Sequence, residues 1–255
     1  MTMTAMQQGL WRAIRTVWVG AGLAFTAWMF WGFQALDVAN GAIRSDTRVE
    51  VLADDEGLRF RPLTNMARTG LIFLPGGIVE PVAYAPLLRR IAERGYPARL
   101  VYLPMRCGCT DSQMDDVLQS IKAIVSDEPA TAWVLAGHSR GGMLASRYAH
   151  ENGAALAGLV LIGTTHPRDF SLAGLSIPLV KIYGTRDGIA PYDGMLRNKH
   201  LLPPATEWVA IAGGNHVQFG YYRHQLGDDS AEISREDQQR ATEGAVFRLL
   251  ERIDR

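Results

Sequence analysis

Cysteine and net charge are both scarce in this sequence. Its 255 residues include two cysteines, Cys107 and Cys109, so no disulfide framework holds the fold together. The 26 lysines and arginines balance 26 aspartates and glutamates. A nucleic-acid-binding protein usually presents a basic face, so the zero net charge gives no reason to expect nucleic acid as a partner. An apolar share of 47% with balanced charge is typical of a folded globular chain.

Clusters of metal ligands are also missing from the sequence. The six histidines do not group together, and Cys107 and Cys109 have no further ligands at a suitable spacing. These two cysteines either stay reduced or form a labile disulfide across one residue, which an oxidising compartment would permit. Asp228 and Asp229 are expected to be solvated acids of a turn. We therefore expect no metal and no cofactor.

Charge is absent from residues 16–33, an apolar run of 18 residues. At about 1.5 Å per residue this run is near the lower limit for a helix that spans a bilayer. Tryptophans lie near its ends, where amphipathic rings favour the membrane interface. Arg12 and Arg15 precede the run, and positive charge before a span favours a cytoplasmic N-terminus. The sequence thus predicts a single-pass membrane protein whose main domain is extracytoplasmic.

The expected organisation is a cytoplasmic tail over residues 1–15, an uncleaved anchor over 16–33, a linker over 34–46 and a soluble domain over 47–255. A cleaved signal segment and a hydrophobic hairpin or core helix are the alternatives. A signal segment usually has a shorter apolar stretch and ends at a small-x-small site. The residues directly after the run form a poor site of this kind, and Ala39-Asn40-Gly41 lies some distance beyond.

Strand-like and helix-like runs alternate over the rest of the chain. Short apolar runs bounded by turn residues predict strands at 49–52, 58–63, 71–74, 100–103, 133–136, 159–162, 179–183 and 207–211. Apolar residues at helical spacing predict helices at 83–94, 111–126, 141–151 and 235–253. Parallel neighbours need crossover connections, so this α/β alternation implies a mostly parallel sheet with helices on both faces. In such sheets, functional residues follow the carboxyl ends of the strands.

A nucleophile motif follows the run at 133–136. Gly137-His138-Ser139-Arg140-Gly141 has the pattern G-x-S-x-G and directly precedes a predicted helix. The two glycines permit a sharp strand-to-helix turn that lifts the Ser139 hydroxyl clear of the backbone. The pattern alone is a weak signal. Between a strand and a helix it favours a catalytic serine over a serine that caps the helix.

An acid and a base follow two later strands. Asp187 comes after the run at 179–183, and His216 comes after the run at 207–211. A serine hydroxyl needs a base to take its proton, and the base needs a third group to orient it. Singly, Asp187 also fits a turn residue and His216 a loop histidine. All three at strand ends, in the order Ser139, Asp187, His216, predict a catalytic triad.

A tetrahedral oxyanion needs two backbone donors. The amide of Arg140, directly after the nucleophile, is the first expected donor. The second should come from the turn after the run at 71–74, with Gly77 the first choice and Ile78 the next.

Four longer segments carry a family resemblance. They are LPGGIVEPVAYAPLLRRIAERGYPARLVYLP, LAGHSRGG, IYGTRDG and GGNHVQFGYYRHQLGDDSAEISREDQQ. With them, the span from about Thr69 to the C-terminus resembles the α/β-hydrolase superfamily, and within it the bacterial, esterase-like group called α/β hydrolase fold 5. The resemblance implies an eight-stranded sheet and the triad Ser139, Asp187 and His216. It implies no particular substrate, and Pro75 stands where many members have histidine.

The loops give limited information about the substrate. Only 15 residues, 163–177, separate the strand after the motif helix from the strand that bears the acid. They are too few for a large cap domain, so we expect an open cleft. Gln218, Tyr221 and Tyr222 follow the base and either bind substrate or pack the loop. His166 and Arg168 either bind an acidic group of the substrate or belong to a solvated loop.

Together these features predict a serine hydrolase. It would cleave a small-molecule carboxylic ester or a related acyl bond through an acyl-enzyme. The alternatives are an acyltransferase that uses the same triad and a non-catalytic, membrane-tethered binding protein of the same fold.

Overall fold

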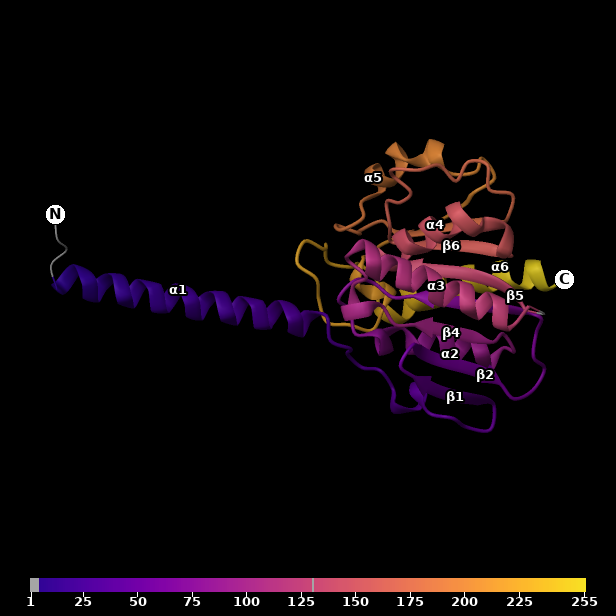
Figure 1. Ribbon diagram of the computed structural model, residues 1–255, viewed down its shortest axis with the longest axis horizontal. Coiled ribbons are helices and arrows are strands. Elements are labelled where there is room, and N and C mark those ends of the chain that lie inside the picture. The colour runs from indigo at the N-terminus through magenta and orange to yellow at the C-terminus, as the bar shows by residue number, and fades with distance from the viewer. Residues whose placement is uncertain (1–4, 130) are drawn as a thin grey trace.

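The computed structural model describes residues 5–129 and 131–255, so residues 1–4 of the expected tail lie outside the described part of the chain (Figure 1). The helices are α1 (Ala5–Gly32), α2 (Ala85–Glu93), α3 (Asp111–Asp127), α4 (Arg140–Asn152), α5 (Tyr192–Arg197) and α6 (Arg235–Asp254). The strands are β1 (Val49–Asp54), β2 (Gly57–Pro62), β3 (Thr69–Leu74), β4 (Ala98–Val101), β5 (Ala132–His138), β6 (Gly158–Ile162), β7 (Leu179–Gly184) and β8 (Glu207–Ile211).

All eight strands form one sheet, in the order β1-β2-β4-β3-β5-β6-β7-β8. The β1–β2 and β2–β4 pairs are antiparallel, and every other neighbouring pair is parallel. The predicted α/β architecture with a mostly parallel eight-stranded sheet is therefore confirmed. The carboxyl ends of β3 to β8 share one edge of this sheet, which we call the catalytic edge.

Helices cover both faces of the sheet. On one face, buried residues of α2 and α6 pack with Val134 and Ala136 of β5. On the other face, α3 and α4 pack with Trp133 and Leu135 of the same strand. Successive strand side chains point to opposite faces, so each apolar run of the sequence contributes to both cores. Continuous burial on two faces explains the apolar stretches within β3, β5 and β6.

The connection between β6 and β7 is short and irregular. Its residues 163–178 contain neither helix nor strand, in agreement with the expected lack of a large cap domain. The sequence analysis did not anticipate α5, a helix of six residues that follows Pro191.

Helix α1 projects from the globular part and begins earlier than the expected start at residue 16 (Figure 1). Within it, Met6–Gly32 is long and apolar enough to cross a membrane, and its most apolar 18-residue window is not buried by the rest of the chain. A signal sequence near the N-terminus would have the same properties.

The segment expected to be a linker, residues 34–46, packs on the domain. Ala42 is buried, and the guanidinium of Arg89 in α2 donates to the carbonyl oxygens of Gly41 and Arg44. The residue before it, Phe33, is also buried. The chain between α1 and β1 is therefore fixed to the domain along much of its length.

Candidate active site

Ser139 occupies a strained turn between β5 and α4. Its backbone φ is 53° and its ψ is −113°, a conformation that side-chain-bearing residues rarely adopt. A Cβ added at Gly137 would lie 2.3 Å from the backbone of Gly141, and one added at Gly141 would lie 2.1 Å from the carbonyl oxygen of Leu74. Both glycines of the motif are thus needed for close packing of the turn. The Ser139 amide donates to Ile162 of β6 at 2.9 Å, which fixes the turn to the sheet.

Asp187 and His216 form a buried pair. Nδ1 of His216 lies 2.9 Å from Oδ2 of Asp187 and 3.1 Å from Oδ1. The amides of Ile189 and Ala190 also donate to Oδ1 of Asp187, at 3.0 and 2.6 Å. A neutral imidazole that donates from Nδ1 presents Nε2 as a proton acceptor. Nε2 of His216 is buried and has no hydrogen-bond partner in the described part of the chain.

The serine lies at the strand end beside this pair. The ring of His138, the residue before Ser139, packs against the ring of His216 with 4.5 Å between centroids. Among the described residues, no hydrogen bond joins the Ser139 hydroxyl to His216. Catalytic hydrogen bonds are often longer without substrate and shorten when it binds. The structure thus pairs Asp187 with His216 and packs His138, the residue before Ser139, against His216.

The two expected oxyanion donors, Gly77 and Arg140, lie side by side. A Cβ added at Gly77 would be 3.2 Å from the Cβ of Arg140. Arg140 is the first residue of α4, so its amide has no acceptor within the helix. The amide of Ile78, the other expected donor, already donates to the carbonyl oxygen of Arg106 at 2.5 Å. The geometry therefore favours Gly77 over Ile78.

Tyr84 and His138 hold the turn that carries Gly77. The Gly76 amide donates to the Tyr84 hydroxyl at 3.0 Å, and that hydroxyl lies 2.8 Å from Nδ1 of His138. The Tyr84 oxygen thus accepts from the Gly76 amide and shares a second hydrogen bond with the His138 ring. Burial lowers the pKa of His138 well below its usual value, so the ring stays neutral. The sequence analysis missed both residues, although His138 is the second position of the serine motif.

A cleft of about 240 Å³ opens beside Ser139. Its wall includes Met143 of α4, residues 163–166 and Arg168 after β6, and Ile189 with Ala190 after β7. Arg168, Thr165 and Ile189 also border a neighbouring cleft of about 330 Å³. His166 and Arg168 thus line the same cleft as Ser139. Burial, aided by the positive charge of Arg168, lowers the pKa of His166 to about 4.

The three residues expected to bind substrate do not line this cleft. Tyr222 is fully buried and stacks on Phe33, with 6.4 Å between ring centroids. The backbone of Tyr221 bonds to Ala83 and Leu36, and the side-chain amide of Gln218 donates to Ile233 at 3.3 Å. Substrate binding by Tyr222 is incompatible with its burial. Their positions agree with the alternative interpretation, in which these side chains pack the loop.

Asp228 is half-buried, whereas the sequence analysis expected a solvated turn acid. Its Oδ1 accepts hydrogen bonds from the amides of Gly188 at 3.1 Å and His216 at 3.2 Å, and its Oδ2 accepts one from Val217 at 2.9 Å. Burial raises the pKa of Asp228, and the backbone hydrogen bonds oppose that rise. This carboxylate thus ties the loop after Asp187 to the loop of His216.

Cys107 and Cys109 are joined in a disulfide. The guanidinium of Arg140 donates to the carbonyl oxygens of Cys107 and Gly108, so the bridged loop contacts the first residue after the nucleophile. No group of three or more histidine, cysteine or acidic side chains is placed to hold a metal ion among the described residues.

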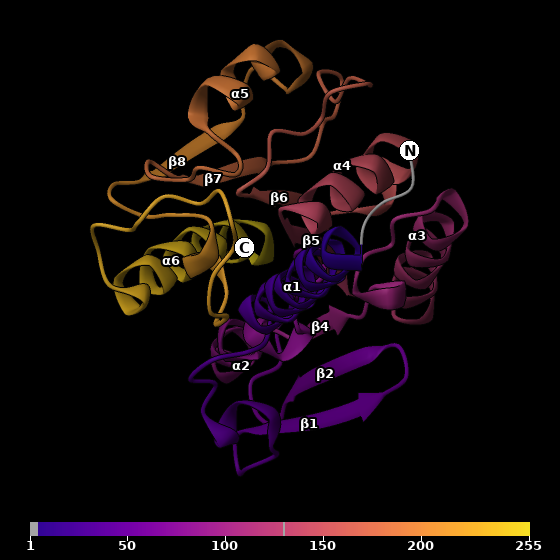
Figure 2. The same cartoon turned by 90° about the vertical axis from the view of Figure 1, so that its left-hand side faces the viewer.

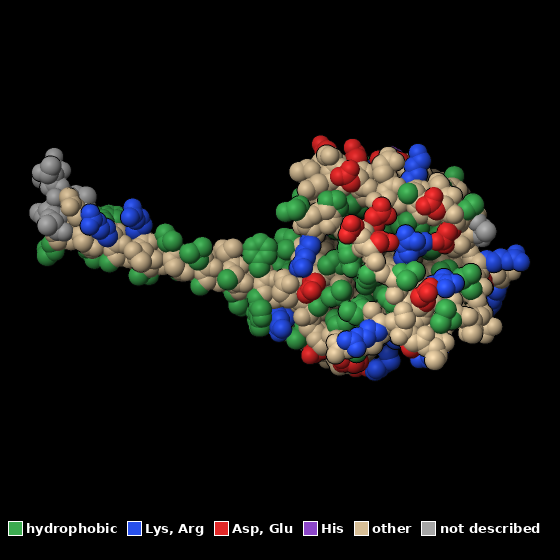
Figure 3. Space-filling model, turned by 60° about the horizontal axis from the view of Figure 1, so that its bottom comes forward, with side chains coloured by type: hydrophobic (Ala, Val, Ile, Leu, Met, Phe, Trp, Pro, Cys, Tyr) green, Lys and Arg blue, Asp and Glu red, His purple; other side chains and the backbone are tan. Residues whose placement is uncertain are grey.

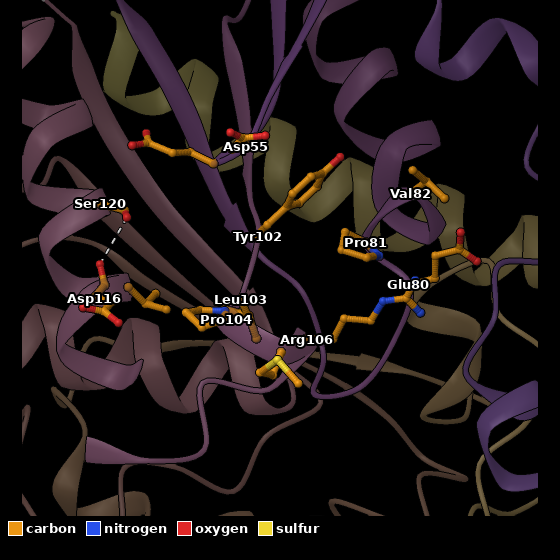
Figure 4. Close-up of a pocket in the computed structure, with 13 residues that line it drawn as sticks. Asp55, Glu80, Pro81, Val82, Tyr102, Leu103, Pro104, Arg106, Asp116 and Ser120 are labelled. Carbon is orange, nitrogen blue, oxygen red and sulfur yellow. Dashed lines mark hydrogen bonds between the residues drawn. The ribbon is translucent and has the colours of Figure 1, made fainter. Parts of the chain in front are cut away.

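Another cavity, of about 610 Å³, has no triad residue in its wall (Figure 4). Apolar side chains after β4 form part of its wall, together with Asp116 and Ser120 of α3. Glu80 and Arg106 lie on its other side. Both also contact the residues just after α1: the Ala35 amide donates to Glu80 at 2.8 Å, and Arg106 donates to the side chain of Gln34 at 3.3 Å. This cavity therefore lies next to the base of α1.

Three hydrolases of low sequence identity are among the solved structures similar to this chain. A soluble variant of monoglyceride lipase from Saccharomyces cerevisiae has a TM-score of 0.61 and 12% identity, over 84% of this chain and 98% of that one. A ferulic acid esterase from Streptomyces cinnamoneus has a TM-score of 0.61 and 16% identity, over 76% and 69%. An α/β serine hydrolase without a lid from Xanthomonas campestris has a TM-score of 0.55 and 16% identity, over 81% and 97%. At these identities the likeness concerns the fold alone.

Sequence comparison gives the family. No curated protein matches this chain. The model of the alpha/beta hydrolase family matches residues 70–240, which is more than half of the chain and includes the serine motif, Asp187 and His216. The match agrees with the sheet order, the strained serine turn and the suspected resemblance. The chain belongs to the α/β hydrolase family.

Proposed function

We propose that this hydrolase is a serine hydrolase that cleaves a carboxylic ester or a related acyl bond. The observation that carries the proposal is the buried Asp187–His216 pair, whose ring packs against His138, the residue before Ser139, and whose Nε2 has no partner among the described residues. The strained turn at Ser139 and the adjacent cleft support the same assignment. Esterases and lipases among the structural neighbours are consistent with this chemistry.

The proposed reaction has two halves. The Ser139 oxygen bonds to the acyl carbon while its proton passes to Nε2 of His216, and the bond to the alcohol breaks as the alcohol takes that proton. Water then bonds to the acyl carbon and gives a proton to Nε2. The bond to the Ser139 oxygen breaks, that oxygen regains the proton, and a carboxylic acid leaves. Asp187 keeps the imidazole oriented and stabilises its positive form.

The amides of Gly77 and Arg140 would bind the oxyanion in both halves. Oriented donors in a site shielded from water stabilise developing negative charge strongly. The Tyr84–His138 contact supports this role, because it fixes the turn that precedes Gly77.

We further propose that α1 is an uncleaved anchor and that the domain is extracytoplasmic. Burial of Phe33 in the domain supports an α1 that remains attached. A disulfide is typical of oxidising compartments, and Arg12 with Arg15 favours a cytoplasmic start of the span.

Replacement of the nucleophile tests the reaction. Ser139→Ala should reduce turnover of p-nitrophenyl acetate by about a thousandfold or more and abolish labelling by a fluorophosphonate. Ser120→Ala is the matched control, since the Ser120 hydroxyl donates to the carbonyl oxygen of Asp116 in its own helix. Retained labelling of Ser139→Ala would reject the assigned nucleophile. A wild-type protein that is folded but neither labelled nor active would instead indicate the non-catalytic binding protein.

A further inference from the structure

Helix α1 leaves the domain at the catalytic edge. The carbonyl oxygen of Phe33, one residue after α1, accepts a hydrogen bond from the Glu80 amide at 2.9 Å. Glu80 follows Gly77 by three residues, so their Cα atoms are at most about 10 Å apart. Gly77 in turn lies beside Arg140, the residue after Ser139. Figure 2 looks along α1 onto this edge of the sheet. The candidate active site and the end of α1 are therefore close neighbours.

A loop of the domain lies along the last turns of α1. The amides of Arg223 and His224 donate to the carbonyl oxygen of Gly32 at 3.0 and 3.1 Å. The His224 ring packs on that of Trp28, with 4.2 Å between centroids, and the guanidinium of Arg223 lies over the ring of Trp31. A Cβ at Gly32 would lie 2.6 Å from the His224 carbonyl oxygen, so a larger residue there would separate loop and helix. These contacts fix the direction of α1 relative to the catalytic edge.

The surface around the junction, where the loop of Arg223 and His224 meets the end of α1, has side chains that could contact a layer of lipid headgroups. Met105 is 85% exposed and Leu226 is 58% exposed, although both are large apolar side chains. Arg106 directly follows Met105, Arg223 precedes Leu226 by three residues, and both supply positive charge for lipid phosphates. Figure 3 shows apolar side chains that continue from α1 onto the adjoining part of the domain. Tryptophans at the end of α1 are typical of the membrane–water interface.

We propose that the catalytic edge rests on the membrane surface and that the substrate is an acyl ester of a membrane lipid. If α1 crosses the bilayer, the end of α1 that joins the domain lies at the level of the lipid headgroups. The contacts of Arg223 and His224 with α1 then hold the catalytic edge toward these headgroups. The cleft beside Ser139, about 240 Å³, is smaller than the sites that usually enclose a whole drug-sized ligand. A site that faces the bilayer needs to hold only the ester, because the acyl chain stays among the lipids. This inference rests on the proposed hydrolase function and on α1 as a retained anchor.

Two esters with the same leaving group separate this inference from the proposed function. The full-length protein is reconstituted in phosphatidylcholine vesicles and assayed with soluble p-nitrophenyl acetate and with p-nitrophenyl palmitate dissolved in the same bilayer. The double variant Met105→Asp/Leu226→Asp should hydrolyse the acetate at the wild-type rate. It should hydrolyse the palmitate about tenfold more slowly, because charged side chains keep the edge away from the lipid. Met66→Asp, which alters an exposed methionine before β3 at the opposite edge, should change neither rate.

A second variant tests the junction without touching the exposed apolar residues. A flexible spacer of twelve glycines and serines between Gly32 and Phe33 should reproduce the selective loss on the palmitate. If the wild-type protein hydrolyses neither ester, the proposed function fails. If it hydrolyses the acetate, and the palmitate rate is absent or unaffected by both variants, the membrane-facing site is wrong and the hydrolase assignment stands.

Discussion

Among single residues, Asp228 has the least expected position. It is not part of the proposed triad, yet its carboxylate accepts amides from the loop of the acid and from the loop of the base. The amides of Thr185 and Arg186 already bond across to Ile211 and Gly214. Asp228 adds bonds to the amide that follows the acid and to the amide of the base itself. We interpret Asp228 as a positioning residue for the acid–base pair.

Asp228→Asn tests this interpretation. An amide has one acceptor oxygen, so at least one of the backbone donors would face an NH₂ group. We expect kcat for p-nitrophenyl acetate to fall about tenfold at an unchanged KM, because a small displacement of a catalytic group is costly. The free energy of unfolding should fall by about 1–3 kcal/mol.

Asp229→Asn is the control, because Asp229 is exposed and its neighbours contact its backbone. It should leave kcat and stability unchanged. Equal effects of the two substitutions, or a change confined to KM, would contradict a positioning role for Asp228.

Among the elements, β7 carries an unusual charge. Lys181 lies at its centre, is buried, and donates from Nζ to the His166 carbonyl oxygen at 2.7 Å. Burial lowers the pKa of Lys181 from 10.5 to about 7. Between these two values the unfolded chain keeps a proton that the folded chain has lost. The unfolded state then binds more protons, so the free energy of unfolding rises with pH across this window.

Lys181→Met should remove that rise. In the wild-type protein the lysine contributes up to about 1.4 kcal/mol for each pH unit between pH 7 and pH 10. Urea unfolding in detergent, followed by near-UV circular dichroism at pH 7.5 and 9.5, measures the difference. Lys199→Met is a close control. Lys199 is exposed, and its Nζ lies 6.0 Å from the centre of the Trp208 ring, which is 5.9 Å from Nζ of Lys181. If Lys181→Met keeps the wild-type slope, Lys181 is not neutral in the fold at high pH.

The elements that the sequence predicted well are those with strong local signals. Strands buried on both faces have uninterrupted apolar runs, and the serine turn has two glycines that close packing requires. Contacts between segments that are distant in the sequence have no comparable local pattern. The bond from Tyr84 to His138 and the role of Asp228 depend on how separate loops meet. The role of Tyr222 was left open because an aromatic side chain after the base has the same local pattern whether it binds substrate or packs beneath a loop.

At the scale of the whole molecule, the topology is open to direct test. If the domain is extracytoplasmic, Cys107 and Cys109 should resist a maleimide reagent in intact membranes until a reductant is added. A protease added outside the cytoplasm should degrade the domain and spare α1. The protein should also remain with membranes in high salt and leave them in detergent. Thiols that react without a reductant, or release by salt, would contradict the proposed topology.

The hydrogen bonds at Gly32 and Phe33 have a mechanical consequence. The backbone of residues 32–36 is held in place by hydrogen bonds to the domain. These bonds are formed by Gly32, Phe33, Ala35 and Leu36. A bilayer thicker or thinner than the apolar length of α1 changes the tilt of such a helix. That torque would reach Glu80, and through it the turn of Gly77, before any flexible segment could absorb it. Lipid thickness would then act on the catalytic geometry itself.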